Sequence, residues 1–466
     1  MKITPIIGLE VHVELKTKSK MFCGCRADHF HVKPNTHTCP VCLGLPGALP
    51  VPNKRACEWC LKLGLALNCS INEQSFFERK NYFYPDLVKG YQITQLQKPF
   101  AINGYLNIES HKIRINRAHM EEDTGKSIHV DGSTLLDFNR SGVPLVEIVS
   151  EPDIQSAEQA KKYLNKLQQI IRYIGISDAD IEKGSMRCEP TVNVCLDDKF
   201  YTPLVEIKNV ASLTGVMNAI NYEIKRQIDA YQSDGITKNY SNKTTRGWDA
   251  DKNQTFLQRE KEGSADYRYF PEPDIPPIIF NKEQIEEIRQ SLPVLPDEKI
   301  AQYKLLGLSD YDAFILADTK ESAEIFDKII SIESSREFAK FSANLLTGPL
   351  KTIKIDINKI NPDYFKKLFD HKLDFSSTVI KQLILDSYQT GLDPLEIAKE
   401  KNLFQVSDTN TLEQFAKEVI EANPKAVEDY HQNPLAIGFL VGQLMKVSKG
   451  SANPQTGKEI LEKLLK

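Results

Sequence analysis

The sequence has little of what would place it in several common protein classes. It contains two tryptophans and no apolar run that approaches the ~18 residues of a membrane-spanning helix. Residues 1–5 do not resemble the start of a signal peptide. The 59 lysines and arginines are outnumbered by 63 acidic residues, and this net charge of -4 argues against a broadly basic nucleic-acid coat. We therefore expect a cytoplasmic protein with no membrane contact.

The sequence also lacks the phosphate-binding loops of common kinases. It has no G-x-x-x-x-G-K-[ST] segment and no glycine-rich loop of the protein-kinase type. If the chain uses ATP, a different kind of surface must hold the nucleotide.

Cysteines are comparatively abundant, with nine in the chain. In a protein expected in the cytoplasm, they are thiols or metal ligands more often than disulfides. Four of them form two close pairs with Gly or Pro in or beside the turns, which predicts a structural zinc site within residues 23–42: Cys23, Cys25, Cys39 and Cys42. Cys57 and Cys60 fall on one stripe of a helix expected after Asn53, so we interpret them as core residues.

Residues 119–126 (HMEEDTGK) form the most unusual stretch of the chain. Three consecutive carboxylates repel one another unless a positive charge lies among them, and a divalent metal that also holds phosphates would supply that charge. A solvated acidic loop is the alternative interpretation of this segment taken by itself.

Two further segments place acidic side chains on predicted strands. Residues 7–15 alternate between apolar and polar, which predicts a half-buried strand with Glu10, His12 and Glu14 on its polar face. An ordinary solvent-facing strand is the alternative. Residues 144–150 are almost wholly apolar and predict a strand buried on both faces. Its one carboxylate, Glu147, would need a partner, because an isolated buried charge is costly.

The sequence pattern changes near Pro293. Residues 1–292 mix short strands, turns and a few helices, which predicts an α+β domain with largely antiparallel sheets. Ser156 and Gln159 predict the capped start of one helix that ends near Gly175. Beyond Pro293 the helical periodicity predicts an all-α region, divided into a helical domain over residues 293–398 and a small helical tail over residues 399–466. Lysines near the end of the tail could contact phosphates or form a solvated terminus: Lys446, Lys449, Lys458, Lys463 and Lys466.

Four longer segments together resemble one known family. They are residues 8–15 (GLEVHVEL), 39–47 (CPVCLGLPG), 79–86 (RKNYFYPD) and 266–274 (DYRYFPEPD). In this order they are similar to the B subunits of bacterial aspartyl/glutamyl-tRNA amidotransferases, and the likeness extends to a YqeY-like tail. The resemblance implies a catalytic cradle domain that uses ATP to phosphorylate Glu on tRNA(Gln) or Asp on tRNA(Asn). It further implies ammonia from a glutaminase A subunit, a C subunit that completes a heterotrimer, and a tail that contacts the misacylated tRNA.

The resemblance also implies roles for individual residues. Phosphoryl transfer depends mainly on positioning and charge neutralisation, so it needs a metal ion and cationic side chains. Motif positions assign Mg²⁺ to Glu10, His12, Glu122 and Glu151. Two more carboxylates are reserves for the same catalytic centre, Glu121 and Glu147. The cations expected at the catalytic centre are Lys80 and Arg140. Those expected to bind the nucleotide are Lys126, Arg187, Lys208 and Arg268.

The sequence departs from the family pattern after residues 184–188 (GSMRC). The family usually continues with an Asp-Ala-Asn type of string, whereas this chain has Glu189-Pro190-Thr191. The role of Glu189 is therefore open. In the tail, Asn433-Pro434 stands where related chains often carry a Gly-Lys pair, which weakens any claim that this turn contacts tRNA.

Two other functions are compatible with parts of the sequence. His12 and Glu14 together with the Cys39–Cys42 pair superficially resemble the motifs of zinc nucleobase deaminases, although Thr38 stands where that motif has proline. The other alternative is a non-catalytic tRNA-binding adaptor with a zinc knuckle and a helical tail. Zinc content after His12→Ala tests the first alternative, and amide formation on charged tRNA by the same variant tests the second.

Overall fold

The computed structural model describes residues 1–466 except 240, 261–266, 354, 405–408, 449–451 and 466. The chain divides into two units, Met1–Leu295 and Pro296–Lys466. The three-domain division with boundaries at 292/293 and 398/399 stays a prediction. Asp266, Lys449 and Lys466, which belong to segments singled out above, lie outside the described residues.

A sheet of ten strands, counted over the described residues, forms the centre of the first unit. Its strands are β1 (Ile3–Glu14), β2 (Ser70–Ile71), β6 (Ala101–Ile108), β7 (His111–Glu122), β10 (Pro144–Ser150), β11 (Met186–Leu196), β12 (Phe200–Tyr201), β13 (Val205–Lys208), β14 (Thr244–Asp249) and β15 (Gln254–Glu260). Their order is β15-β14-β13-β11-β1-β10-β7-β6-β2, with β12 beside β11. Among these strands the β13–β14 pair is parallel and the others are antiparallel, which confirms the predicted α+β class.

Three small sheets complete the strands described in this unit. The first pairs β16 (Phe270–Pro271), β4 (Glu78–Asn81) and β5 (Tyr91–Thr94). The second pairs β17 (Ile278–Ile279) with β3 (Gln74–Ser75), and the third is a hairpin of β8 (Lys126–Val130) and β9 (Ser133–Asp137). The β16–β4 pairing brings residues 270–271 beside residues 78–79, so two of the family-like segments meet in space.

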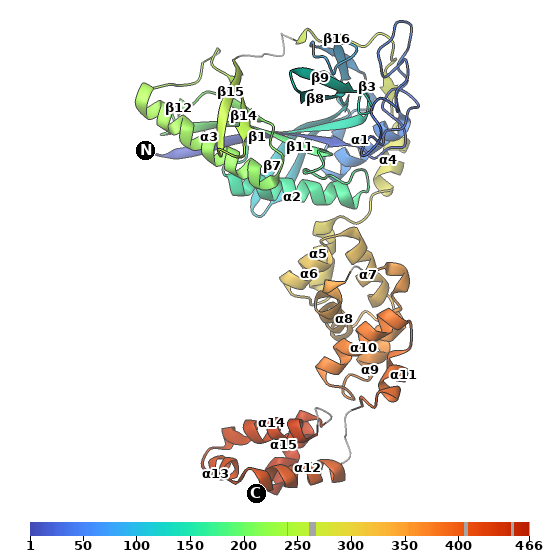
Figure 1. Ribbon diagram of the computed structural model, residues 1–466, viewed down its shortest axis with the longest axis vertical. Coiled ribbons are helices and arrows are strands. Elements are labelled where there is room, and N and C mark those ends of the chain that lie inside the picture. Colours follow the sequence, from blue (N-terminus) through green and yellow to red (C-terminus); the bar gives the residue numbers. More distant parts are fainter. Residues whose placement is uncertain (240, 261–266, 354, 405–408, 449–451, 466) are drawn as a thin grey trace. The chain divides into compact units, whose positions relative to one another are not determined.

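One face of the large sheet is covered by helices. These are α1 (Lys54–Ala66), α2 (Ala157–Tyr173) and α3 (Leu213–Asp234); α4 (Lys282–Gln290) packs against α1. Figure 1 shows α2 and α3 side by side along the sheet. The apolar positions of β1, Leu9, Val11 and Val13, are at most 1% exposed and belong to this core. Because successive strand residues face opposite sides, Glu10 and His12 point away from the helices.

The predicted helix boundaries and core cysteines are largely confirmed. The Ser156 side chain accepts a hydrogen bond from the Gln159 amide at 3.1 Å, and α2 ends two residues before Gly175, which has a φ of +76°. In a complete capping box the Gln159 side chain would accept a hydrogen bond from the amide of Ser156. Here it accepts from the amide of Gln155 instead. In α1, which begins after Asn53, the paired cysteines at 57 and 60 are buried.

The second unit is helical, as predicted. Its elements are α5 (Pro296–Leu305), α6 (Asp310–Leu316), α7 (Lys320–Ile330), α8 (Arg336–Thr347), η2 (Pro349–Thr352), η3 (Ile357–Lys359), α9 (Pro362–Asp370), α10 (Ser377–Thr390), α11 (Pro394–Glu400), α12 (Thr409–Ala422), α13 (Pro424–Gln432), η4 (Pro434–Ala436), α14 (Ile437–Val447) and α15 (Pro454–Leu464). Helices α12, α14 and α15 share a hydrophobic core of their own. Over the described residues, we find no helix that combines the length and apolar character needed to cross a membrane.

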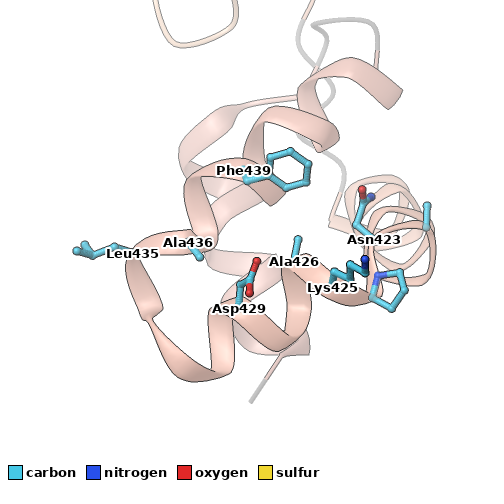
Figure 2. A pocket seen from close by; sticks show the side chains of 9 residues that line it. Asn423, Lys425, Ala426, Asp429, Leu435, Ala436 and Phe439 are labelled. Atoms are coloured by element: carbon cyan, nitrogen blue, oxygen red, sulfur yellow. The ribbon is translucent and has the colours of Figure 1, made fainter.

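The last helices line an open pocket of about 660 Å³. It lies where α12, α13 and α14 meet, and Figure 2 shows Phe439 of α14 across it from Ala426 and Asp429 of α13. Leu435 at its edge is 85% exposed. Its lining is mixed, with Lys425 and Asp429 as the charged members, so it lacks the convergent ionisable groups of a catalytic centre.

Candidate active site

Four neighbouring strands present a row of polar side chains on the face of the sheet opposite the helices. The backbone register pairs His12 of β1 with Glu147 of β10 on one side and with Arg187 of β11 on the other. It also pairs Glu147 with His119 of β7. Residues directly opposite each other in a sheet point to the same face, so the register places these four side chains together.

His12 contacts two buried carboxylates. Its Nε2 lies 3.2 Å from Oε2 of Glu147 and 3.6 Å from Oε2 of Glu121. One potential ligand atom from each of the three residues lies within 4.8 Å of the other two. Imidazole nitrogen and carboxylate oxygen in this arrangement can bind a divalent metal ion, and Mg²⁺ in particular uses one or two carboxylates together with substrate phosphates. We call His12, Glu121 and Glu147 the acid–histidine cluster.

The cluster concentrates opposite charges in a buried place. Burial and the neighbouring Glu121 would raise the pKa of Glu147, but His119 and His12 lower it to about 2. Burial would lower the pKa of His12, but hydrogen bonds to both carboxylates raise it to about 10. An imidazolium at position 12 therefore neutralises part of the carboxylate charge. A metal ion bound through the same nitrogen has to replace that proton.

Further side chains support the carboxylates, since Thr94 and Gln92 donate hydrogen bonds to Glu121 at 2.9 and 3.2 Å. Nε2 of His119 lies 3.5 Å from Oε1 of Glu121 and 3.8 Å from Oε2 of Glu147, and Nη2 of Arg117 lies 3.6 Å from Oε1 of Glu147. His119 is buried, and its Nδ1 has no hydrogen-bond partner among the described residues. A buried polar atom without a partner is costly in a purely structural role and common at functional sites.

The cluster lies in a cavity of about 750 Å³, within the range of small-molecule sites. The predicted site residues that line it are Glu10, His12, Lys80, Glu121, Glu147, Arg187 and Lys208. Four tyrosines also contribute to the wall: Tyr82, Tyr84, Tyr267 and Tyr269. The cavity thus combines acidic, cationic and aromatic walls, a combination suited to an anionic ligand that carries a planar ring.

Lys80 is the cation best placed to receive an anion. In the described part of the chain its ammonium has no carboxylate within ion-pair distance, and it lies 5.0 Å from the ring centre of Tyr267 and 5.8 Å from that of Tyr82. Burial would lower the pKa of Lys80, but Glu121, Tyr269 and Glu147 raise it above its usual value. The side chain therefore stays charged and available in the cavity.

The other two predicted cations that line the cavity, Arg187 and Lys208, already have carboxylate partners. Nη2 of Arg187 lies 2.6 Å from Oδ2 of Asp123, and Nζ of Lys208 lies 2.8 Å from Oε2 of Glu189 and 2.9 Å from Oε1 of Glu206. These pairs hold the cationic groups in position on the sheet. The open question of Glu189 thus has a structural answer, because its carboxylate positions Lys208.

The four predicted cysteines form a second site. One sulfur from each of Cys23, Cys25, Cys39 and Cys42 lies within 4.8 Å of the others, so the cluster can hold a metal ion. The Sγ atoms of Cys39 and Cys42 are 3.9 Å apart. This separation matches the roughly 3.8 Å expected between sulfurs around tetrahedral zinc, where each Zn–S bond is ≈ 2.3 Å. We call these residues the cysteine cluster.

The surroundings of the cysteine cluster favour thiolate at Cys42. The amide of Cys39 donates to its Sγ at 3.2 Å, and the fully buried Lys20 donates through Nζ at 3.5 Å. The hydrogen bond with Cys23, together with that amide and the Lys20 ammonium, lowers the pKa of Cys42 to about 5 against the opposing effect of burial. Thiolate is the form that binds zinc.

Comparison with known proteins identifies the chain's relatives. Residues 5–286 match the family described as the GatB/GatE catalytic domain, and residues 324–465 match the GatB domain. The chain belongs to the GatB family. Relatives named as the B subunit of aspartyl/glutamyl-tRNA(Asn/Gln) amidotransferase are 47% identical in Persephonella marina, 44% in Pseudothermotoga lettingae and 45% in Thermosipho melanesiensis, with all of this chain and all of each relative covered. The resemblance inferred from the four sequence segments is therefore confirmed.

In this GatB-family chain two members of the predicted metal set, Glu122 and Glu151, lie away from the acid–histidine cluster. Glu122 is on β7 directly after Glu121 and so points to the opposite face, where its Oε1 accepts hydrogen bonds from the Lys89 side chain and the Ile93 amide. Glu151 lies four residues from Glu147, or ~13 Å along a strand, and its carboxylate accepts from Asn116. Neither lines the cavity. The predicted reserves, Glu121 and Glu147, are the carboxylates that meet His12.

Of the remaining predicted residues, Arg140, Lys126 and Arg268 are not part of the cavity lining. Glu10, which does line it, is two residues from His12 and outside the cluster; burial, then Glu147 and Glu206, raise its pKa to about 7. Arg140 donates to the carbonyls of residues 124 and 125 and lies 3.8 Å from Asp123. Lys126 is exposed on the β8–β9 hairpin, and Arg268 is exposed with a φ of +43°.

Three residues of the site of this GatB-family chain had no individual role assigned from the sequence, although two of them, His119 and Asp123, lie in the segment 119–126 singled out above. Arg117, His119 and Asp123 share the face of Glu121, because they are separated from it by two or four residues. Alternation through residues 117–123 is the pattern that could have found them. The run of acidic residues makes this alternation hard to recognise, because consecutive carboxylates do not indicate which of them face the cavity.

Proposed function

We propose that this chain carries the ATP-dependent activation step of a tRNA amidotransferase. The substrate would be the side-chain carboxylate of Glu esterified to tRNA(Gln) or of Asp esterified to tRNA(Asn). The observation that carries the proposal is the meeting of the acid–histidine cluster and the available Lys80 ammonium in one cavity. The names of the curated relatives support the substrate class.

The chemistry explains why a carboxylate must be activated. Its oxygen is a poor leaving group, so ammonia cannot displace it directly. In the proposed reaction a carboxylate oxygen attacks the γ-phosphorus of ATP, the bond from that phosphorus to ADP breaks, and an acyl phosphate forms. Ammonia then attacks the acyl carbon, the bond from carbon to the phosphate oxygen breaks, and inorganic phosphate leaves. The nitrogen loses a proton to solvent and the amide remains.

The residues of the cavity fit these requirements. Mg²⁺ bound by the acid–histidine cluster would neutralise charge on the phosphates of ATP. Lys80 would bind a phosphate oxygen, and Arg187 and Lys208 would orient the remaining anionic groups of the two substrates. His119 and Arg117 would hold the carboxylates of Glu121 and Glu147 in the required direction.

The proposal includes partners. Ammonia would come from an A subunit that hydrolyses glutamine, with a C subunit completing a cytoplasmic heterotrimer, and the C-terminal helices would contact the tRNA. The cysteine cluster would hold a structural Zn²⁺ apart from the chemistry, because it shares no residue with the acid–histidine cluster. That separation also disfavours a nucleobase deaminase, which requires a histidine and cysteines on one zinc.

The test reconstitutes the chain with its A and C partners and supplies Glu-tRNA(Gln), Mg-ATP and ammonium. We expect Gln-tRNA(Gln), and an acyl phosphate that hydroxylamine traps when ammonia is withheld. His12→Ala and Glu147→Gln should lower the rate by about a hundredfold or more, since metal-based charge neutralisation contributes several kcal/mol. Glu151→Gln is the matched control and should stay within about twofold of the unchanged chain, like most surface changes.

Two results would overturn the proposal. If the His12 and Glu147 variants formed amide at the unchanged rate, the non-catalytic adaptor would be the better interpretation. If Glu151→Gln lost activity while Glu147→Gln kept it, the cavity would not be the catalytic centre. Binding of tRNA by each variant, measured by filter retention, separates a loss of chemistry from a loss of substrate binding.

A further inference from the structure

A series of aromatic rings leads along the wall of the cavity to its rim. Ring centres are 6.2 Å apart between Tyr269 and Tyr267, 6.1 Å between Tyr267 and Tyr82, and 5.9 Å between Tyr82 and Tyr84. All four tyrosines line the cavity. Tyr84 is 56% exposed, whereas Tyr82, Tyr267 and Tyr269 are partly buried, so Tyr84 is the most accessible ring of the series.

The segment that carries Tyr84 is held in place before any ligand binds. The side-chain amide of Asn81 donates to the carbonyls of Tyr267 and Arg268, at 3.1 and 2.8 Å, which ties the two tyrosine-bearing segments together. The carbonyl of Tyr84 accepts from the amide of Leu87 at 3.0 Å. Because the backbone that carries the ring is held in this way, less conformational entropy is lost when a flat partner stacks on the ring.

The neighbouring aromatic residue has a different environment. Phe83 is 77% exposed and does not line the cavity. Its ring lies beside Gly90, where a Cβ atom would come within 3.3 Å of the ring, and Gly90 has a φ of +71° that favours glycine. Of these two adjacent exposed rings, that of Tyr84 lines the cavity and that of Phe83 does not.

The order of chemical groups in the cavity matches the order of groups in a nucleotide. The acid–histidine cluster suits a metal-bound phosphate, and the Lys80 ammonium lies over the rings of Tyr82 and Tyr267, where a second anionic oxygen would be bound. From the two rings beside Lys80 the aromatic series continues to the exposed Tyr84. Bases of nucleotides and of unpaired RNA ends are commonly held by stacking on such side chains.

We infer that Tyr84, backed by Tyr82 and Tyr267, stacks on an adenine base whose phosphate or acyl end lies deeper in the cavity. This inference rests on the proposed function. In that reaction two substrates carry adenine, namely ATP and the 3′-terminal adenosine of the charged tRNA. The chemistry of recognition is the same for both, and the experiment identifies which of them uses the ring.

The experiment uses the complete enzyme with its partner subunits. KM for ATP and KM for Glu-tRNA(Gln) are each measured at saturating levels of the other substrate, together with kcat. Tyr84→Leu should raise one of the two KM values by roughly fivefold to a hundredfold, the range expected when one base loses its stacking partner. Phe83→Leu removes an exposed ring outside the cavity and should stay within about twofold. Tyr84→Phe keeps the ring and should raise the same KM less than Tyr84→Leu does.

The two substrates are then distinguished directly. A rise in KM for ATP alone assigns the ring to the nucleotide. A rise for Glu-tRNA(Gln) alone assigns it to the tRNA end, and Tyr84→Leu should then weaken inhibition by uncharged tRNA but not by tRNA that lacks its terminal adenosine. Unchanged KM values, or an equal effect of Phe83→Leu, overturn the inference. An unchanged chain that forms no amide would overturn the proposed function instead. Melting temperatures of all variants separate either result from misfolding.

Discussion

The cysteine cluster and the acid–histidine cluster are assembled in different ways. The four cysteines come from two short turns within residues 23–42, and each pair is separated by one or two residues. The three members of the acid–histidine cluster come from β1, β7 and β10, and they span residues 12 to 147. The first set depends on local turns, whereas the second depends on how strands pair. Sequence spacing can reveal the first kind of site, but strand register decides the second.

The largest expected effect tests whether the cysteine cluster is self-contained. Cys42→Ser should abolish zinc binding and lower the free energy of unfolding by about 4 kcal/mol or more, because loss of a structural metal is among the most destabilising changes known. His12→Ala should leave the zinc content at about one ion per chain. Elemental analysis of the purified variants and thermal melting measure both quantities. Loss of zinc in His12→Ala would mean that the two clusters share a ligand. The cysteine cluster would then not be a self-contained site.

The next effect tests strand register with two adjacent residues. Glu121→Gln should lower amide formation by about a hundredfold or more, because it removes a carboxylate from the acid–histidine cluster. Glu122→Gln should instead lower the free energy of unfolding by about 3 kcal/mol, since it leaves the largely buried Lys89 without its carboxylate partner. Steady-state rates and urea unfolding curves distinguish the two outcomes.

A reversed result would be informative. If Glu122→Gln lost activity at full stability while Glu121→Gln remained active, β7 would have to be shifted by one residue relative to its neighbours. A shift of one residue moves every side chain of a strand to the other face. Comparing Glu121→Gln with Glu122→Gln therefore tests the register of β7, because the two variants carry the same chemical change at adjacent positions.

The same reasoning explains what the sequence could and could not predict. Alternation in β1 predicted the shared face of Glu10 and His12, and the apolar run of β10 predicted that Glu147 would be buried and need a partner. These features are local, so they follow from the period of a strand. The choice between Glu121 and Glu122 depends on pairing between β7 and β10, which are far from β1 in sequence. No local pattern records that pairing.

Local sequence patterns also did not predict the aromatic rim of the cavity. The segments 79–86 and 266–274 were recognised as family-like strings, but their contact through β4 and β16 was not predicted. Their tyrosines form one aromatic wall because the β4–β16 pairing and the Asn81 side chain hold the two segments together. Contacts between segments so far apart in the sequence can be identified only from the folded structure.

The smallest expected effect sharpens the comparison by asking whether the cysteine cluster needs help from outside its two turns. Lys20→Met keeps a long side chain but removes the buried ammonium that donates to Cys42 at 3.5 Å and to the Phe138 carbonyl at 3.2 Å. Four thiolates around Zn²⁺ carry excess negative charge, so zinc affinity should fall by about 10- to 100-fold, as for other supporting partners of metal ligands. Competition with a chromophoric chelator measures the affinity, and Lys18→Met, at an exposed neighbour, is the control. Unchanged affinity in Lys20→Met would show that the two turns alone determine the site.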